Sequence, residues 1–220
     1  MKQTHVYLVP GLAAGKEIFR NIKLPDEKYP LHILEWMIPE KRETIQEYAK
    51  RMASRIMEDH FILVGVSFGG VMVQEMEAYL KPKKVVIISS VKSRNELPAR
   101  LKLARKTKAY KLVPTSLVSN VSDFTKFAIG PRTKKRLRLY NEYLSVRNKT
   151  YLDWAIQQMV QWKREKASEE IIHIHGDQDA VFPIQNIQNA KIIEGGTHVM
   201  IINKGSKISQ QLLNILENYG

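Results

Sequence analysis

The chain of 220 residues contains no cysteine. Disulfide bonds, thiolate metal sites and a thiol nucleophile are therefore excluded. Among the side chains that form covalent intermediates, serine is the natural nucleophile that remains. We expect a protein that uses no cofactor and no metal.

Long hydrophobic runs are also missing, because no uninterrupted apolar stretch approaches the roughly 20 residues of a membrane span. The first residues, 1–5, lead directly into a short apolar run and do not have the pattern of a secretory signal. We expect a cytoplasmic protein without a transmembrane segment. A chain of 220 residues suits a single domain that buries a substantial core.

Acidic residues are scarce in the middle of the chain. Residues 81–150 hold 19 of the 35 Lys and Arg residues but only 3 of the 22 Asp and Glu residues. The net charge of +13 therefore belongs to one region. Between residues 93 and 166 the strand signal disappears, and basic helix-prone sequence predicts helices over 96–111, 133–146 and 151–166. We interpret 93–166 as an inserted helical cap, and 1–92 with 167–220 as the core.

The rest of the chain alternates between short apolar runs and helical patterns. This alternation predicts an α/β fold, with a mostly parallel sheet of about six strands and helices on both faces. A Thr44-x-x-Glu47 capping box marks the start of one helix. The predicted strands are 6–9, 31–34, 61–66, 85–88, 171–174 and 191–193, and the predicted core helices are 44–57, 68–80 and 206–218.

The most informative motif is Gly65-Val66-Ser67-Phe68-Gly69, which follows the apolar run 61–64 and precedes a helical segment. A serine on a sharp strand-to-helix turn needs neighbours without bulk, and the glycines supply them. A five-residue pattern of this kind also arises by chance in loops, so its placement carries the argument. We interpret Ser67 as a catalytic nucleophile.

Serine needs a histidine base and a carboxylate that orients this base. Two downstream strands end in suitable residues. His175-Gly176-Asp177-Gln178-Asp179 follows one, and Gly195-Gly196-Thr197-His198 follows the other. Because the carboxyl ends of parallel strands share one edge of a sheet, these loops are expected to meet near Ser67. The other five histidines are interpreted as structural or solvated.

Through these three segments the chain resembles a small α/β-hydrolase, over its whole length apart from the cap. The resemblance implies a triad of Ser67, Asp179 and His198, since the final residue of the family's H-G-x-x-D pattern maps to Asp179 rather than Asp177. It also implies an oxyanion hole formed by the backbone N–H groups of Leu12 and Phe68. Where most family members have His-Gly before the first donor, this chain has Pro10-Gly11.

The implied activity is that of a serine hydrolase, which cleaves a carboxylic ester or thioester through an acyl-enzyme. The alternatives are a carbon–carbon bond hydrolase or lyase of the same fold, and a catalytically inactive ligand-binding protein. An aromatic stripe on the last cap helix has two interpretations, packing against the core or lining a substrate pocket. Its candidate substrate-binding residues are Trp154, Met159 and Trp162.

The basic cap is the sequence's clue to the substrate. A solvated lysine-rich surface is one interpretation, and recruitment of an anionic acyl carrier to a small-molecule acyl site is the other. Some family members, notably carrier-protein methyl ester esterases, resemble the second arrangement. We expect no nucleic-acid partner, because no recognised motif accompanies the basic cluster 132–138.

Overall fold

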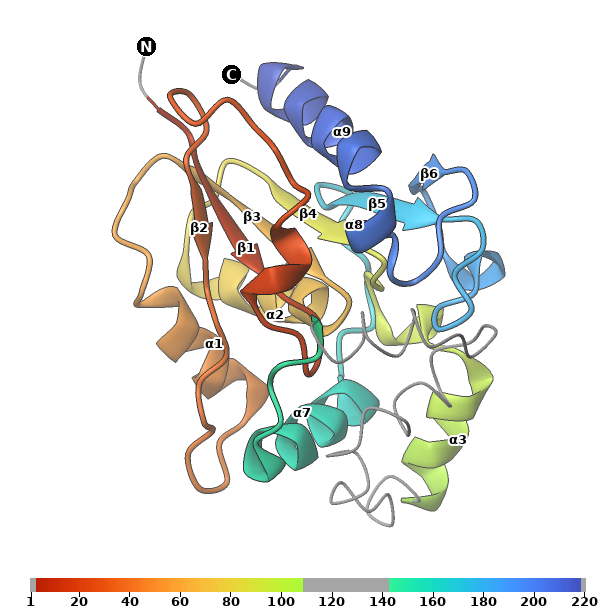
Figure 1. Cartoon of the computed structure of the whole chain (residues 1–220). Helices are drawn as coiled ribbons and strands as arrows, with labels where there is room; N and C mark the ends of the chain where they lie inside the picture. The colour runs from red at the N-terminus through yellow and green to blue at the C-terminus, as the bar shows by residue number, and fades with distance from the viewer. Residues whose placement is uncertain (1–2, 109–142, 219–220) are drawn as a thin grey trace.

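A computed structural model of the chain describes residues 3–108 and 143–218. At its centre is a sheet of six parallel strands in the order β2-β1-β3-β4-β5-β6 (Figure 1). The strands are β1 (His5–Val9), β2 (Leu31–Ile33), β3 (Phe61–Val66), β4 (Val85–Ile88), β5 (Ile172–Gly176) and β6 (Lys191–Ile193). The predicted parallel sheet is confirmed.

The central strands are apolar on both sides, as strands covered by helices on both faces must be. All six residues of β3 and all four of β4 are buried. In the register, Leu8 of β1 pairs with Val64 of β3, and Val64 pairs with Val86 of β4. Because side chains alternate along a strand, one face of the sheet carries Val6, Leu8 and Ile62, and the other carries Tyr7, Val9 and Leu63.

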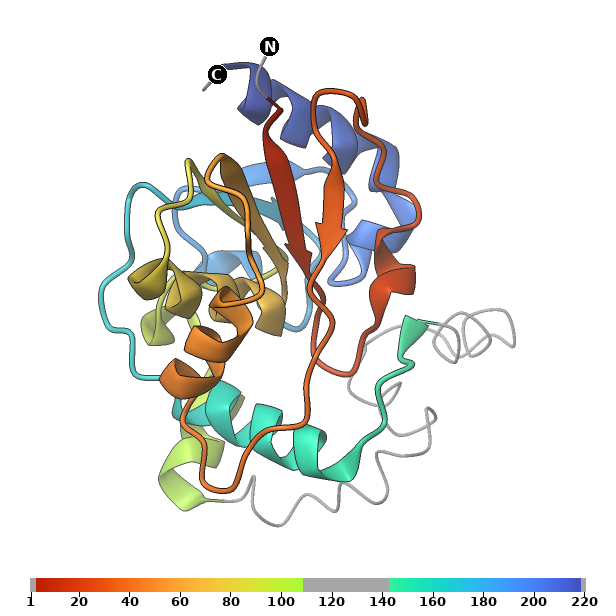
Figure 2. The same ribbon diagram turned by 90° about the vertical axis from the view of Figure 1, so that its left-hand side faces the viewer.

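One face packs against α1 (Ile45–Ala53), α2 (Phe68–Met76) and α7 (Lys149–Gln161). The other packs against η1 (Lys16–Phe19), α8 (Met200–Asn203) and α9 (Gly205–Asn218). Figure 2 shows the sheet between α1 and α2 on one side and α9 on the other. The other helices within the described residues are α3 (Ala99–Thr107), η2 (Glu77–Tyr79), η3 (Arg94–Glu96) and η5 (Ile184–Asn186).

The predicted helix ends differ from the observed ones. The helix predicted over 44–57 begins at Ile45, and Thr44 forms its N-cap with a complete capping box to Glu47. The helix predicted to reach residue 80 changes to a 3-10 turn after Met76. In the region predicted to be a cap, α3 is shorter than predicted, and α7 begins and ends earlier than predicted. Most of the helix predicted over 133–146 lies outside the described residues.

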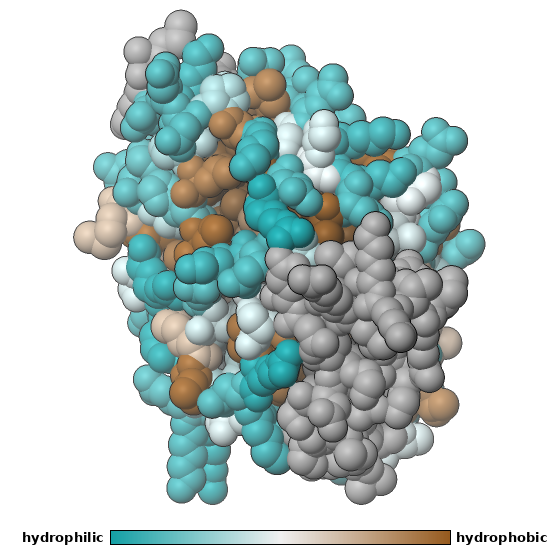
Figure 3. Space-filling model, viewed as in Figure 1, coloured by the Kyte–Doolittle hydropathy of each residue, from teal (hydrophilic) through white to brown (hydrophobic). Residues whose placement is uncertain are grey.

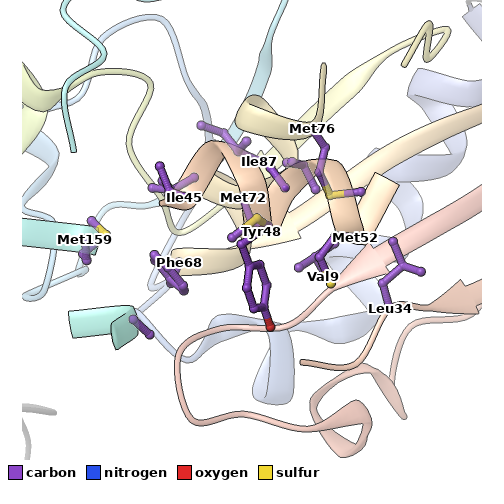
Figure 4. Close-up of a cluster of buried hydrophobic side chains, with 14 of the residues drawn as sticks. Val9, Leu34, Ile45, Tyr48, Met52, Phe68, Met72, Met76, Ile87 and Met159 are labelled. Atoms are coloured by element: carbon purple, nitrogen blue, oxygen red, sulfur yellow. The ribbon is translucent and has the colours of Figure 1, made fainter. Parts of the chain in front are cut away.

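Of the two clusters of buried side chains in the described residues, the larger lies on the α2 face of the sheet. Figure 4 shows Tyr48 and Phe68 within it, with Met159 of α7 close by. On the surface, hydrophilic side chains cover much of the described part of the face in Figure 3, with apolar side chains between them. Among the helices of residues 3–108 and 143–218, none is long and apolar enough to cross a membrane.

Candidate active site

Ser67 stands on the sharp turn between β3 and α2, with φ 54° and ψ −118°. A side chain at this positive φ is strained, so the surrounding structure must hold it. Close backbone packing does this, because a Cβ at Gly65 would lie 2.2 Å from the carbonyl oxygen of Gly69. A Cβ at Gly69 would lie 2.3 Å from the carbonyl oxygen of Pro10. The small residues of the motif are therefore required by packing.

Three loops bring Ser67, His198 and Asp179 into one hydrogen-bonded chain. The Ser67 Oγ lies 2.9 Å from Nε2 of His198, and Nδ1 of His198 lies 2.9 Å from Oδ2 of Asp179. The loops follow β3, β5 and β6, at the carboxyl edge of the sheet. The structure thus unites side chains that are up to 131 positions apart in the sequence.

The Asp179 carboxylate is fixed on both oxygens. Its Oδ1 accepts backbone N–H bonds from Val181 at 2.8 Å and Phe182 at 2.9 Å, which leaves Oδ2 for His198. Burial on its own raises the pKa of Asp179, but His198 and the backbone donors lower it below its ordinary value overall. Asp177 is exposed, so of the two carboxylates of this loop Asp179 is the one that meets His198.

Two buried histidines of β5 support this loop, and sequence reasoning did not assign them a role in the site. His175 shares a hydrogen bond with the Phe182 carbonyl oxygen at 2.9 Å and another with His173 at 3.1 Å. Burial lowers the pKa of both imidazoles, and that of His173 falls well below its ordinary value. The neutral rings therefore hold the segment whose Phe182 packs edge-on against His198, with ring centres 5.3 Å apart.

The two predicted oxyanion donors lie on either side of Ser67. Phe68 opens α2, and the first N–H groups of a helix have no acceptor within the helix. The Ser67 N–H is already used, since it donates to the carbonyl oxygen of Ile88 at 2.9 Å. On the other side, Gly11 approaches so closely that a Cβ there would lie 3.4 Å from the Ser67 Cβ.

The orientation of the Leu12 N–H follows from the Gly11 carbonyl. This oxygen accepts from Nε1 of Trp36 at 3.0 Å and from the Ala14 N–H at 3.0 Å. In a trans peptide the N–H points opposite to the preceding C=O, so Leu12 directs its N–H away from Trp36 and Ala14. Trp36 thus supports the loop in which this chain has Pro10-Gly11 instead of the family's His-Gly. No local sequence signal indicated this residue.

Ser67 and His198 line a pocket of about 80 Å³ among the described residues. Apart from these two, its lining is aliphatic side chains, one glycine and one tyrosine. The residues are Gly11, Leu12, Ala14, Ile18, Val66, Tyr143, Leu144, Val199, Ile201 and Ile202. An apolar lining with a few convergent polar groups is the usual composition of a small-molecule site.

The candidate substrate-binding residues Trp154, Met159 and Trp162 are not among those lining residues. All three are buried in the core cluster, with Trp162 only 2% exposed. Trp154 donates to the Glu43 carbonyl oxygen at 2.8 Å, and Trp162 donates to a carboxylate oxygen of Glu75 at 2.8 Å. The pocket-lining interpretation is therefore replaced by the packing one, because the indoles find hydrogen-bond partners inside the protein.

The described part of the predicted cap consists of residues 93–108 and 143–166. Its helix α7 packs on the core through Tyr151, Leu152 and Ala155. Its helix α3 carries basic side chains that surround a hollow of about 460 Å³, lined by Arg94, Asn95, Leu97, Lys102, Arg105, Lys106 and Val160. The basic cluster 132–138 lies outside the described residues.

Neither a protein-family model nor a curated protein matches the chain. Solved structures do match. A thermophilic esterase from Thermogutta terrifontis is 13% identical, with a TM-score of 0.72, over 99% of this chain and 91% of that one. ClbQ from the colibactin NRPS/PKS pathway is 12% identical, with a TM-score of 0.65, and the match covers 99% of this chain and 98% of that one. A 2-hydroxy-6-oxo-6-phenylhexa-2,4-dienoate hydrolase from Rhodococcus sp. strain RHA1 is 16% identical, with a TM-score of 0.68, and the match covers 98% of this chain and 91% of that one.

At identities of this size a structural match establishes the fold. The six parallel strands, the helices on both faces and these neighbours together show that the chain has the α/β-hydrolase fold. The fold predicted from the sequence is therefore confirmed.

Proposed function

We propose that the protein is a serine hydrolase that cleaves a carboxylic ester or thioester through an acyl-enzyme. The observation that carries this proposal is the hydrogen-bonded chain from Ser67 through His198 to Asp179, with both of its links at 2.9 Å. Fold alone does not define an activity, whereas a nucleophile, a base and an orienting acid in contact define a reaction class.

In the first step the Ser67 Oγ attacks the carbonyl carbon of the substrate, and Nε2 of His198 takes the hydroxyl proton. The carbonyl oxygen becomes an anion, which the N–H groups of Phe68 and Leu12 stabilise. Asp179 accepts from Nδ1, so that Nε2 carries the lone pair needed by a base. His198 then gives its proton to the departing alcohol or thiol, and the acyl group stays on Ser67.

In the second step a water molecule repeats the attack on the acyl-enzyme. His198 takes one proton from the water and returns it to Oγ as the carbon–oxygen bond to Ser67 breaks. The products are a carboxylic acid and the free enzyme. The lowered pKa of the buried Asp179 carboxyl keeps this group ionised, as both steps require.

The pocket favours an apolar acyl group. The side chains that surround Ser67 there are aliphatic or aromatic, including Ile18, Tyr143 and Ile201. Burial of hydrocarbon against them is worth about 0.8 kcal/mol per methylene, which can position an acyl chain for attack. The esterase among the structural neighbours is consistent with this reaction class.

The leaving group is proposed to be anionic, as in an acyl carrier. Arg94, Lys102, Arg105 and Lys106 face one hollow beside α3. Such a cluster raises the local concentration of an anionic substrate and speeds its association, and salt weakens the effect.

Covalent labelling tests the proposed nucleophile. A fluorophosphonate should label the protein once, and Ser67→Ala should abolish the label. Ser145→Ala is a matched control, because this serine is exposed and its Oγ bonds to Glu17 instead of a histidine. Loss of both label and turnover in His198→Ala would support the shared mechanism. An unlabelled wild-type protein, or a label that survives in Ser67→Ala, would contradict the proposal.

A hydrolysis panel tests the substrate class. It should compare p-nitrophenyl esters of several chain lengths with acyl-CoA and acyl-carrier-protein esters. Mass spectrometry of the rapidly quenched enzyme should find the acyl group attached to Ser67. Turnover of a carbon–carbon substrate in the absence of ester turnover would favour the alternative reaction of the same fold.

A further inference from the structure

A second group of polar side chains lies at the opposite edge of the sheet from Ser67. His5 begins β1, and in the register Tyr7 pairs with His32 of β2. Since residues two apart in a strand share a face, the side chains of His5, Tyr7 and His32 lie on the same face. Glu58, in the segment before β3, reaches the same place, because the Tyr7 hydroxyl donates to its Oε2.

The three possible ligand atoms lie close together. Nδ1 of His5 is 2.8 Å from Nε2 of His32. One ring nitrogen from each histidine and one carboxylate oxygen of Glu58 all lie within 4.8 Å of one another. Within residues 3–108 and 143–218, these three residues are the group of His, Asp or Glu side chains with the spacing of metal ligands. We propose that His5, His32 and Glu58 form a zinc site, independent of the proposed hydrolase site.

The donor types fit this metal. Zn²⁺ is bound by imidazole nitrogens at about 2.0–2.1 Å and by carboxylate oxygens at about 2.0–2.2 Å. The two imidazole nitrogens that bind a tetrahedral ion are then roughly 3.3 Å apart. Nδ1 of His5 and Nε2 of His32 therefore need to separate by only about 0.5 Å from their hydrogen-bonded distance. Two nitrogens and one oxygen argue against Ca²⁺ and Mg²⁺, which prefer oxygen ligands. The fourth position would be held by water.

Neighbouring groups orient these ligands. Tyr7 donates to the Glu58 carboxylate, and its ring stacks on that of His32 with centres 4.8 Å apart. In metal sites, a ligating carboxylate commonly accepts a hydrogen bond from a neighbouring side chain. Loss of this neighbour typically lowers the affinity for the metal by about 10- to 100-fold. His5 and His32 also stack, with ring centres 5.0 Å apart. Both histidines are partly exposed, so an ion can reach them from solvent.

The position of the group indicates a structural role. His5 pairs with Phe61 at the start of β3, whereas Ser67 follows the end of that strand. Six residue steps of about 3.3 Å, from Phe61 to Ser67, place the two sites about 20 Å apart. An ion here would join the edge strand β2, the central strand β1 and the segment before β3. Because only the folded chain assembles these ligands, binding would stabilise the fold.

Zinc titration of untagged, metal-stripped protein tests the proposal. The background should be His198→Ala, which removes the imidazole of the hydrolase site as a competing ligand. Calorimetry with Zn²⁺ and the visible absorption of bound Co²⁺ report stoichiometry and geometry, and the thermal midpoint reports stabilisation. The test variants are His32→Gln and Glu58→Gln. The matched control is His60→Gln, which lies at the same edge, where Nδ1 of His60 lies 3.0 Å from the Thr4 hydroxyl.

We expect one Zn²⁺ per chain, a tetrahedral Co²⁺ spectrum and a higher thermal midpoint with metal. His32→Gln and Glu58→Gln should each weaken binding at least tenfold, and Tyr7→Phe should weaken it 10- to 100-fold while keeping the ring. His60→Gln should bind as the background does. Absence of binding in the background protein, or equal affinity in all these variants, would overturn the proposal. Because the proposed zinc ligands and the proposed triad share no side chain, failure of this test leaves the hydrolase proposal untouched.

Discussion

Replacement of Trp36 by phenylalanine tests the proposed oxyanion hole through a residue outside the proposed triad. The substitution keeps an aromatic ring beside Phe68 and Tyr151, whose ring centres lie 5.4 Å and 5.3 Å from that of Trp36. It removes the indole N–H that donates to the Gly11 carbonyl oxygen at 3.0 Å. This carbonyl belongs to the peptide group that carries the Leu12 N–H.

The magnitude follows from the remaining contacts. The Gly11 oxygen keeps its bond from the Ala14 N–H at 3.0 Å, so it is not left unpaired. One hydrogen bond is worth about 0.5–1.5 kcal/mol net, and each 1.36 kcal/mol changes a rate tenfold. If the whole orienting effect serves the transition state, kcat should fall by about 2- to 13-fold. Complete loss of an oxyanion donor, which costs about 10²- to 10³-fold, is the upper limit.

Steady-state kinetics on an ester that the wild-type protein turns over would measure this effect. KM should change less than twofold, because the donors act on charge that develops only in the transition state. Trp154→Phe is the matched control, since it removes an indole bond of 2.8 Å to the Glu43 carbonyl oxygen in the same core cluster. The reasoning is refuted if Trp36→Phe keeps full kcat, or if both variants lose kcat equally.

Three further predictions concern the acid, the pH dependence of stability and the basic surface. Asp179→Asn should lower kcat by about 10⁴-fold, because the imidazole loses its required tautomer, whereas Asp177→Asn should be nearly neutral in the same assay. Burial lowers the pKa of His173 and His175 in the folded chain, so at pH values below the ordinary histidine pKa of about 6.5 the unfolded chain binds more protons than the folded chain. The free energy of unfolding, measured with urea, should therefore be constant with respect to these groups above about pH 6.5. Below that pH it should fall by up to about 1.4 kcal/mol per pH unit for each histidine, and His173→Asn should reduce this slope. A flat profile between pH 5 and 6.5 would contradict the buried neutral rings. Finally, kcat/KM for an acyl-carrier ester should fall as salt rises, while that for a small neutral ester should hardly change. Parallel salt curves would argue against an anionic leaving group.

The sequence was sufficient to predict the parts of the site that depend on neighbouring residues in the chain. An apolar run, a serine between glycines and a helical pattern identify the turn at Ser67 without any long-range information. The edge rule for parallel strands then brings Asp179 and His198 to the same place, and the observed hydrogen bonds agree with this expectation.

Long-range contacts could not be predicted in this way. Trp36 supports Gly11 across 25 residues, from a loop whose direction depends on how β2 pairs with β1. The contact between His5 and His32 likewise requires the register, because a shift by one residue would place them on opposite faces. In neither case does a pattern in the sequence indicate the partner.

The aromatic stripe of α7 shows why the same pattern had two interpretations. A helix that covers a core and a helix that lines a pocket both present apolar side chains at helical spacing. Burial of their polar atoms decides between the two, since a pocket would leave an indole N–H for a ligand. In α7 the Trp154 N–H is bonded inside the protein, and its ring lies edge-on to Phe68 with centres 6.1 Å apart.

This packing places one apolar cluster beneath both proposed oxyanion donors. Trp36 contacts the Phe68 ring and holds the Gly11 carbonyl, while Trp154 contacts the Phe68 ring from α7. A close-packed cluster transmits small displacements, because its side chains have few alternative positions. The helix α7, which lies in the predicted cap, therefore contacts the proposed site through the Phe68 ring, whereas no residue of α7 is among those that line the pocket of Ser67 and His198.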